Sequence, residues 1–494
     1  MSSSSTSFSC SSGSENEQSL LASLPLRKIP GSYGYPFFGP VHDRLDYFYN
    51  QGTEKFFKTR MDKYESTVFR ANMPPGPFIA SNPNVIVLLD AVSFPILFDT
   101  SKVEKRDVLD GTYMPSTAFT GGYRTCAYLD PSEPHHSLLK HFFLSILTAR
   151  HNKFIPLFQS SMAQLFITLE DNVADKGEAN YNDLNDLAAF DFVFKLFCDK
   201  DGPSETKLGS KGSSIITKWL FLQLAPLMSL GLSFVPNFVE DLMLHTFPLP
   251  FILVKSDYKK LYDVFYTSAV SLLDEAESMG ISREEACHNL VFMTGFNAYG
   301  GMKAWFPNMM KWIGSNAGEA LHLRLADEIR TVVKAEGGVT LSALEKMSLT
   351  KSVVYEALRL EPGVPFQYAK AKDDMIIHNH DAKFQVKKGE TLFGYQPIAT
   401  RDPKIFENPE EFIGNRFMGK EGGKLLKYVY WSNGRETDIS TAENKICPAK
   451  DLVVLLSRVL LVEFFLRYDT FSIEATTVML SALVKFKSLT KATS

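Results

Sequence analysis

Cys447 is the side chain in this sequence best placed for metal chemistry. It stands between a polar, turn-rich loop that begins at Tyr428 and a run from Leu452 to Leu466 that is apolar nearly all round. Such a run is typical of a buried helix, and Pro448 can open it because a first-turn residue needs no backbone donor. A sulfur at a helix start lies where the dipole favours a thiolate, a good axial ligand for haem iron. A lone cysteine is more often an ordinary buried thiol, so its neighbours in the sequence decide.

A second set of side chains combines one acid with two guanidinium groups. Glu356 and Arg359 are three residues apart in a helical pattern and therefore share one face. Such pairs are common on protein surfaces and carry little information alone. Arg416, which follows about 57 residues after Arg359, could complete a buried Glu–Arg–Arg cluster. A Trp-Ser-Asn-Gly turn and then Cys447 come next in the chain.

Composition limits the class of protein. The chain has 494 residues, of which 45% are hydrophobic, so it can bury a large core. Its formal net charge of −4 gives no indication of a nucleic-acid partner. The five cysteines are widely spread without a CxxC pair, so neither a disulfide scaffold nor a zinc cluster is expected. The 39 phenylalanines suit a protein that encloses an apolar ligand.

The N-terminal residues have a different composition from the rest. Residues 1–24 are rich in serine and predict a disordered tail before the folded residues 25–494, which form one large domain or two closely packed ones. The tail has no apolar run of signal-peptide length, lacks arginine, and carries Glu15 and Glu17, which argues against a plastid transit peptide. Charged residues interrupt the apolar run after Cys447, which makes it a poor transmembrane candidate. We therefore expect a cytoplasmic protein without a membrane anchor.

Local patterns predict mainly helices with small sheets, an α+β organisation. Short strands are expected around the turn at Pro74-Pro75-Gly76, followed by an apolar helix near Val85 to Leu89. Ser132 stands where a helix cap is expected. In the helix that follows, His136 and Lys140 lie four residues apart and so share a face.

Residues 219–254 form the most apolar stretch of the chain. Pro226, Gly231 and Pro236 cut it into pieces too short to cross a bilayer. Two interpretations remain open. The stretch forms buried core helices joined by a loop, or it forms a flap over a substrate entrance that dips into a membrane surface. The second interpretation would make the protein peripherally membrane-associated.

In their order along the chain, these elements resemble the cytochrome P450 superfamily. The resemblance rests on the ExxR pair at Glu356 and Arg359, the Arg-Phe segment at Arg416, and Cys-Pro-Ala-Lys from Cys447 at the start of the last long helix. The central helix lacks the acid–alcohol pair with which a monooxygenase delivers protons to dioxygen. The loop before the cysteine is about nine residues longer than usual. Gly363 also departs from the family, which usually has proline there, and this puts the local loop in doubt.

The missing acid–alcohol pair and the longer loop before the cysteine are both similar to features of one branch of the superfamily. This branch acts on plant fatty-acid hydroperoxides and contains hydroperoxide lyases, allene oxide synthases and divinyl ether synthases. Further matching segments are IPGSYGYPFFGP, DRLDYFYNQG, GTYMPSTAFTGGYR and KYVYWSNGRET. The resemblance covers about Leu24 to Ser494. It implies that residues 25–494 form a single haem-thiolate catalytic domain with a cytochrome P450 fold. It also implies substrates that are hydroperoxides derived from linoleic or linolenic acid. It also implies homolytic cleavage of the O–O bond with no need for dioxygen, NADPH or a reductase partner.

Site roles follow from this resemblance position by position. It makes Cys447 the axial thiolate of haem b and places that haem between the central helix and the cysteine loop. Asn297 matches the asparagine that hydrogen-bonds the peroxide oxygens, although helix packing could also explain a polar residue there. Lys105, His136 and Lys140 match positions near the haem propionates, where cations offset buried carboxylates.

The reaction outcome depends on one further position. Leu109 matches the site beside the radical carbon, where allene oxide synthases usually carry phenylalanine and lyases carry leucine. The sequence therefore predicts a hydroperoxide lyase, closest to the non-plastidial lyase-like members, whose hemiacetal product falls apart into an aldehyde and an oxo acid. The alternatives are an allene oxide synthase, a divinyl ether synthase and a non-catalytic haem or lipid carrier. Cys447 and Asn297 together count against the carrier.

Overall fold

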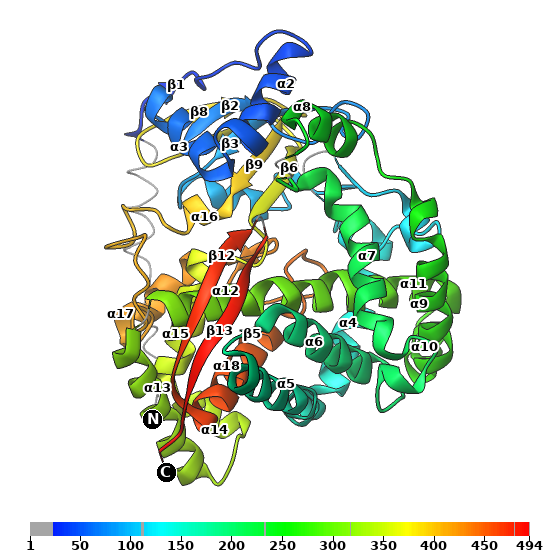
Figure 1. The fold of residues 1–494 in the computed structure, drawn as a ribbon. Coiled ribbons are helices and arrows are strands. Elements are labelled where there is room, and N and C mark those ends of the chain that lie inside the picture. The colour runs from blue at the N-terminus through cyan, green and yellow to red at the C-terminus, as the bar shows by residue number, and fades with distance from the viewer. Residues whose placement is uncertain (1–22, 110–112, 232–233, 317, 479, 494) are drawn as a thin grey trace, which may run out of the picture.

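Helices dominate the structure (Figure 1). The computed structural model describes residues 23–109, 113–231, 234–316, 318–478 and 480–493, so the predicted tail lies almost wholly outside it. The predicted helix-rich organisation with small sheets is confirmed. The α-helices are α2 (Phe38–Leu45), α3 (Thr53–Tyr64), α4 (Pro134–Ala149), α5 (Phe154–Lys176), α6 (Tyr181–Phe197), α7 (Gly212–Leu224), α8 (Asn237–Glu240), α9 (Lys255–Ser268), α10 (Val270–Ser278), α11 (Arg283–Phe292), α12 (Gly300–Asn316), α13 (Gly318–Glu336), α14 (Leu341–Lys346), α15 (Ser348–Leu360), α16 (Gln396–Ala399), α17 (Gly419–Leu425) and α18 (Lys450–Arg467).

Small sheets join the beginning of the chain to its later part. The largest has the order β2-β3-β9-β6-β4, in which β3 pairs in parallel with β9 and β9 pairs antiparallel with β6. Other sheets have the orders β1-β8-β7, β12-β13-β5 and β10-β11. The strands are β1 (Leu26–Arg27), β2 (Val68–Asn72), β3 (Asn84–Leu88), β4 (Val103–Glu104), β5 (Ala179–Asn180), β6 (Phe366–Ala371), β7 (Met375–His378), β8 (Lys383–Val386), β9 (Thr391–Tyr395), β10 (Tyr430–Trp431), β11 (Gly434–Arg435), β12 (Tyr468–Val478) and β13 (Ser481–Lys491).

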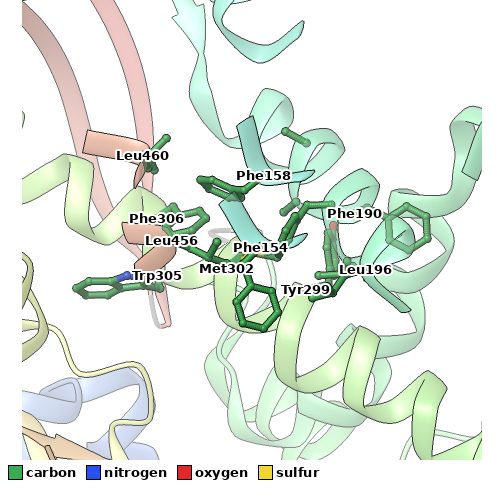
Figure 2. Packing of buried hydrophobic residues seen from close by; sticks show 14 of the residues in the cluster. Phe154, Phe158, Phe190, Leu196, Tyr299, Met302, Trp305, Phe306, Leu456 and Leu460 are labelled. Carbon is green, nitrogen blue, oxygen red and sulfur yellow. The ribbon is translucent and has the colours of Figure 1, made fainter. Parts of the chain in front are cut away.

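Helix α18 is held in the main apolar core, as its sequence predicts. It packs against α5, α13 and α15. Leu456 and Leu460 belong to the same cluster as Phe158 of α5 and Phe306 of α12, whose ring centroids are 5.8 Å apart (Figure 2). Burying each such side chain contributes about 1.5–3 kcal/mol. The start of α18, and with it the loop that carries Cys447, is therefore held by a rigid support.

The beginning of α18 differs from the prediction. The helix begins at Lys450, so Pro448 lies before it rather than in its first turn. The backbone N–H of Cys447 donates to the carbonyl oxygen of Ser432 at 3.1 Å. Because this bond holds the cysteine to the preceding hairpin, the chain enters helical geometry only after Pro448 and Ala449.

Two other local predictions are wrong. The segment expected as a helix near Val85 to Leu89 forms β3, because its β-branched residues suit a strand with partners on both sides. Helix α4 is preceded by Glu133 rather than capped by Ser132. Its first residue is Pro134, whose missing N–H costs nothing at that position.

Residues 219–254 divide into a buried part and an exposed part. Trp219, Leu220 and Leu222 at the end of α7 are buried in the core. The later part contains α8, which lies beside α2 at the top of Figure 1, and many of its apolar side chains are exposed. None of the helices within the described ranges has the length and apolar character required to cross a membrane.

Candidate active site

The loop around Cys447 is built on the β10–β11 hairpin. Asn433 at the turn has a left-handed backbone (φ 63°), a conformation that asparagine tolerates better than most residues. Gly434 packs so tightly that an added Cβ would lie 2.7 Å from Cγ1 of Ile446. Only glycine lets the backbone at position 434 lie this close to the Ile446 side chain. This contact sets the position of the segment that leads into Cys447.

Burial controls the chemistry of the Cys447 thiol. It raises the pKa of Cys447, while the backbone N–H of Ala449 and the charge of Lys140 lower it. The net pKa is raised, so the expectation that the helix start alone favours a thiolate is wrong for the polypeptide by itself. A cationic metal ion would reverse this balance, because coordination deprotonates a thiol outright.

Asn297 lies in a π-helical segment, Met293–Tyr299, between α11 and α12. The Asn297 side chain is exposed, and no described residue hydrogen-bonds to its amide. Gly295 sets the segment close to α7, because a Cβ there would lie 2.6 Å from Cδ1 of Ile216. Short π-helical insertions frequently occur at functional sites. The sequence analysis placed Asn297 on a regular helix and missed this insertion.

A cluster of buried cations lies beside Cys447. Lys105 and Lys140 are 3% and 2% exposed, and Lys105 Nζ donates to Asn433 Oδ1 at 2.5 Å. Lys140 Nζ donates to the carbonyl and side-chain oxygens of Asn444. Lys445 joins them, with Nζ donating to the backbone oxygens of Lys105 at 2.9 Å and Ala127 at 2.8 Å. The structure therefore brings together lysines from three distant parts of the chain.

The nearby carboxylates of Asp130 and Glu133 raise the pKa values in this cluster but do not offset the effect of burial. Burial holds the pKa of Lys105 well below its ordinary value, and the neighbouring charge of Lys445 lowers it further. Burial lowers the pKa of Lys140 and of Lys445 to about 8 each. His136, whose pKa burial lowers to about 4, has a buried Nδ1 with no hydrogen-bond partner among the described residues. An anionic ligand would stabilise the whole set.

These residues fit a haem group. Cys447 can supply an axial sulfur, and Lys105, Lys140, Lys445 and the free Nδ1 of His136 can meet two propionates. Lys445 is a functional candidate that the sequence analysis missed. Its only signal in the sequence is its place two residues before the cysteine.

We expect Lys445→Met to flatten the pH dependence of stability in the haem-free protein. The folded pKa of Lys445 is about 8, below its ordinary value of 10.5, so between these values the unfolded chain binds more protons. Stability therefore rises with pH across this window in the parent protein, and the variant loses the part due to Lys445. Urea unfolding at pH 7.5 and 9.5 measures the difference.

The same variant should lose haem at least about tenfold faster, because a hydrogen bond to a charged group contributes about 1.5–3 kcal/mol. Haem transfer to an acceptor protein measures this rate. Lys424→Met, at an exposed position on α17, is the control and should change neither property. An unchanged pH slope together with unchanged haem loss would show that Lys445 is not part of the site.

The structure brings Glu356, Arg359 and Arg416 together. Arg359 donates to Glu356 at 2.8 and 2.9 Å, and Arg416 Nε lies 3.0 Å from Oε1 of Glu356. Glu356 and Arg359 are fully buried. The two arginines also donate to backbone oxygens. Arg359 donates to Pro409 O at 2.6 Å, and Arg416 donates to Glu407 O at 2.7 Å. The cluster thus fastens the irregular segment that follows α16 to helix α15.

Glu356→Gln should lower the free energy of unfolding by about 3–5 kcal/mol, because it leaves two guanidinium groups without their buried carboxylate. Denaturant unfolding monitored by circular dichroism measures the loss. Glu410→Gln is the matched control. Glu410 pairs with Lys58 and Arg401 but is itself 56% exposed, so its replacement should cost less than about 1 kcal/mol. Equal losses in the two variants would contradict a structural role for the buried cluster.

Leu109 and Gly363 lie in irregular segments. Leu109 is half-buried against the main core, and its N–H donates to Tyr113 O at 2.8 Å. Residues 110–112 beside it lie outside the described ranges. Gly363 is exposed, and nothing lies within 4 Å of the place where a Cβ would be. The surroundings of Gly363 therefore do not require glycine there.

A cavity of about 290 Å³ lies elsewhere, between α3, α16 and the segment near Glu410. Asp90, His380 and Asp402 line it. Asp402 Oδ2 accepts from His380 Nε2 at 2.6 Å and from the Ala91 N–H at 2.9 Å. These polar groups stabilise local turns, and none of the candidate site residues lines this cavity.

Comparison with known proteins establishes the family. The family model described as Cytochrome P450 matches residues 321–435. Allene oxide synthase 3 of Solanum lycopersicum is 56% identical over 480 residues, covering 97% of each chain. The chain belongs to the plant family of cytochromes P450 that contains this synthase. The allene oxide synthase of Arabidopsis thaliana, named chloroplastic, is 54% identical over 470 residues, covering 95% of this chain and 90% of its own. The 9-divinyl ether synthase of Capsicum annuum is 52% identical over 473 residues, covering 95% and 98%.

Family membership confirms the resemblance drawn from the motifs and makes haem the cofactor of this chain. It corrects the predicted reaction. Relatives 54–57% identical over most of the chain are named allene oxide synthases, so the prediction of a hydroperoxide lyase is wrong. That prediction relied on Leu109 alone, and one side chain carries less information than identity spread over the whole fold.

The relatives also bear on location in the cell. Several, including the Arabidopsis protein, are named chloroplastic. These names weigh against the expectation of a cytoplasmic protein without a plastid transit peptide. Residues 1–22, on which that expectation rested, lie outside the described residues.

Proposed function

We propose that this protein is an allene oxide synthase, which converts a hydroperoxide of linoleic or linolenic acid into an allene oxide and water. The observation that carries the proposal is the identity of 54–57% to relatives named allene oxide synthase over 92–97% of this chain. The reaction is a dehydration: one peroxide oxygen leaves as water, and the other becomes the epoxide oxygen.

Cys447 and the buried cations would hold the cofactor, which we assign as haem b. Haem bound through Cys447 would supply the one-electron chemistry that breaks the peroxide O–O bond. Lys105, Lys140 and Lys445 would neutralise the propionates and so fix the plane of the group. The rigid packing of α18 would keep the Cys447 sulfur in place while the substrate reacts.

Asn297 would act on the substrate itself. Its exposed amide can donate a hydrogen bond to a peroxide oxygen and thereby orient the O–O bond. An amide does not titrate, so it cannot relay protons as the acid–alcohol pair of a monooxygenase would. This supports a reaction that needs neither dioxygen nor a reductase partner.

An assay under nitrogen tests this proposal. The purified protein, without NADPH or reductase, should consume fatty-acid hydroperoxide at the same rate as in air, measured by loss of the conjugated-diene absorbance. A strict requirement for dioxygen and a source of electrons would contradict the proposal and indicate a monooxygenase.

We also propose that the protein takes its substrate from a lipid surface through an exposed apolar patch. The patch comprises Tyr35, Phe37, Phe38, Phe78, Phe234, Phe238, Leu242, Met243 and Phe247. Two buried hydrogen bonds of 2.6 and 2.7 Å from Arg44 to Asp241 join its two halves, as does stacking of Phe78 on Phe247 at 5.0 Å. An exposed apolar patch whose halves are joined in this way, in a protein whose proposed substrate is a lipid, supports contact with a membrane surface.

Co-sedimentation with phosphatidylcholine vesicles tests the patch. Replacing Phe234 and Phe238 together with serine should release most of the protein into the supernatant. Leu483→Ser is the matched control, because Leu483 is an exposed apolar residue of β13, outside the patch. Equal binding by both variants would contradict the proposal.

A further inference from the structure

A continuous series of aromatic rings leads from the π-helical segment to the surface. Successive ring centroids are 4.8 Å apart from Phe296 to Phe292, 6.2 Å from Phe292 to Trp219, 5.8 Å from Trp219 to Tyr258, 5.8 Å from Tyr258 to His288, 4.4 Å from His288 to Tyr262 and 5.6 Å from Tyr262 to Tyr266. Phe296 is the residue before Asn297. Tyr266 is 37% exposed.

The tyrosines of this series come from one face of α9. Tyr258, Tyr262 and Tyr266 are spaced four residues apart, so their side chains follow one another along the helix. Trp219 comes from α7, and His288 comes from α11. Trp219 stacks on Tyr258 with an interplanar angle of 13°, and its Nε1 donates to Phe119 O at 3.1 Å.

Tyr258 has a proton acceptor built beside it. Its hydroxyl lies 2.6 Å from His288 Nδ1, and both side chains are buried. Burial lowers the pKa of His288 to about 4, so at neutral pH the ring is uncharged and Nδ1 can accept the phenolic hydrogen. Gly121 leaves room for this ring, because a Cβ there would lie 2.1 Å from His288 Nε2.

This arrangement suits the movement of single electrons. Indole and phenol side chains can be oxidised by one electron far more readily than phenylalanine. A tyrosine that loses an electron also loses its phenolic proton, which His288 can take from Tyr258 and return on re-reduction. Phe292 and Phe296, the innermost rings of the series, lie between Trp219 and Asn297 and would serve as a medium across which an electron tunnels.

We propose that Trp219, Tyr258 and Tyr262 form an electron path from the surface to the haem site, which gives the protein a second, peroxidase-type activity. The proposal rests on the haem site and hydroperoxide substrate of the proposed function. A bound haem would supply the two electrons for a cleavage of the hydroperoxide O–O bond in which both bonding electrons go to the leaving alcohol. Two one-electron donors at Tyr266 would then replace these electrons through Tyr262, Tyr258 and Trp219.

The overall reaction balances. One hydroperoxide and two molecules of a donor such as ascorbate give one fatty alcohol, one water and two ascorbyl radicals, with the two donor hydrogens passing to the second oxygen as water. Without a donor, an oxidising equivalent would rest on Tyr258 or Tyr262 instead of damaging Asn297 or Cys447. The path would thus protect the site against substrate molecules that react by the wrong cleavage.

Electron paramagnetic resonance on the haem-loaded protein tests the path. Rapid freezing after mixing with a peracid should trap a tyrosyl or tryptophanyl radical. A peracid can oxidise haem whether or not the protein dehydrates fatty-acid hydroperoxides, so this readout does not depend on the proposed reaction. Trp219→Phe and Tyr258→Phe should each reduce the trapped radical at least about fivefold. Tyr262→Phe removes only a hydroxyl near the surface, and it should slow radical decay by ascorbate to a similar degree.

Tyr181→Phe is the matched control. Tyr181 is a fully buried tyrosine at the start of α6, outside the series, and its replacement should change neither radical yield nor decay. Haem-loaded variants that retain the parent's radical yield and ascorbate-driven decay would overturn the path. A protein that forms the radical and yet fails to dehydrate fatty-acid hydroperoxides would leave the path standing and remove the proposed function.

Discussion

Cys447→Ala should abolish turnover of fatty-acid hydroperoxides and remove the absorption spectrum typical of a thiolate-bound haem. Cys447 lies three residues before the start of α18, and its backbone is fixed by the 3.1 Å bond to Ser432. Alanine keeps the backbone and removes only the sulfur, so the fold should survive. Activity and the optical spectrum of the reconstituted variant are the two measurements.

Cys126→Ala provides the control for this experiment. The Cys126 sulfur lies 3.9 Å from His136 O, close to the buried cations, yet burial raises its pKa to about 11 and keeps it a thiol. This variant should retain the thiolate spectrum and most of the turnover. A Cys447→Ala protein with normal haem content and undiminished activity would contradict the assignment of the ligand.

Asn297→Ala should reduce turnover on the order of 10²-fold, with a much smaller change in the Michaelis constant. A hydrogen bond to a peroxide that gains charge as its O–O bond breaks is felt mainly in the transition state. The corresponding loss of transition-state stabilisation is about 2.7 kcal/mol. Steady-state kinetics with saturating hydroperoxide separates the two constants.

Asn308→Ala is the matched control on the same helical stretch. Asn308 of α12 is buried and lies 3.5 Å from Leu480 O, so its loss should affect stability rather than chemistry. If Asn297→Ala raised only the Michaelis constant while turnover stayed at the parent value, Asn297 would shape the pocket without assisting cleavage.

Features that depend on local sequence were predictable. Helix α18 follows from a run that is apolar on every face, and α15 follows from helical spacing that puts Glu356 and Arg359 together. Their union with Arg416 could be proposed because motif order along the chain carries the family resemblance. The same resemblance named Lys105, His136 and Lys140, which the structure gathers in one cluster.

Features that depend on tertiary contacts were not predictable. In the π-helical segment at Asn297, Gly295 packs against Ile216 of α7, a contact that no local sequence pattern predicts. Lys445 became visible only when folding placed it beside Lys105 and Ala127. Val85 to Leu88 form part of a strand because β2 and β9 offer partners. Leu109 alone does not predict the reaction, because the outcome depends on the whole site and not on one side chain.

The fate of oxygen in isotopically labelled water tests the central claim most directly. An allene oxide hydrolyses to an α-ketol whose new hydroxyl oxygen comes from the solvent, because one peroxide oxygen has already left as water. We therefore predict that the main product formed in ¹⁸O-water is an α-ketol carrying one heavy oxygen, detected by mass spectrometry. Chain-cleaved aldehydes, or a divinyl ether with no oxygen from the solvent, as the main product would contradict the assignment of this protein as an allene oxide synthase.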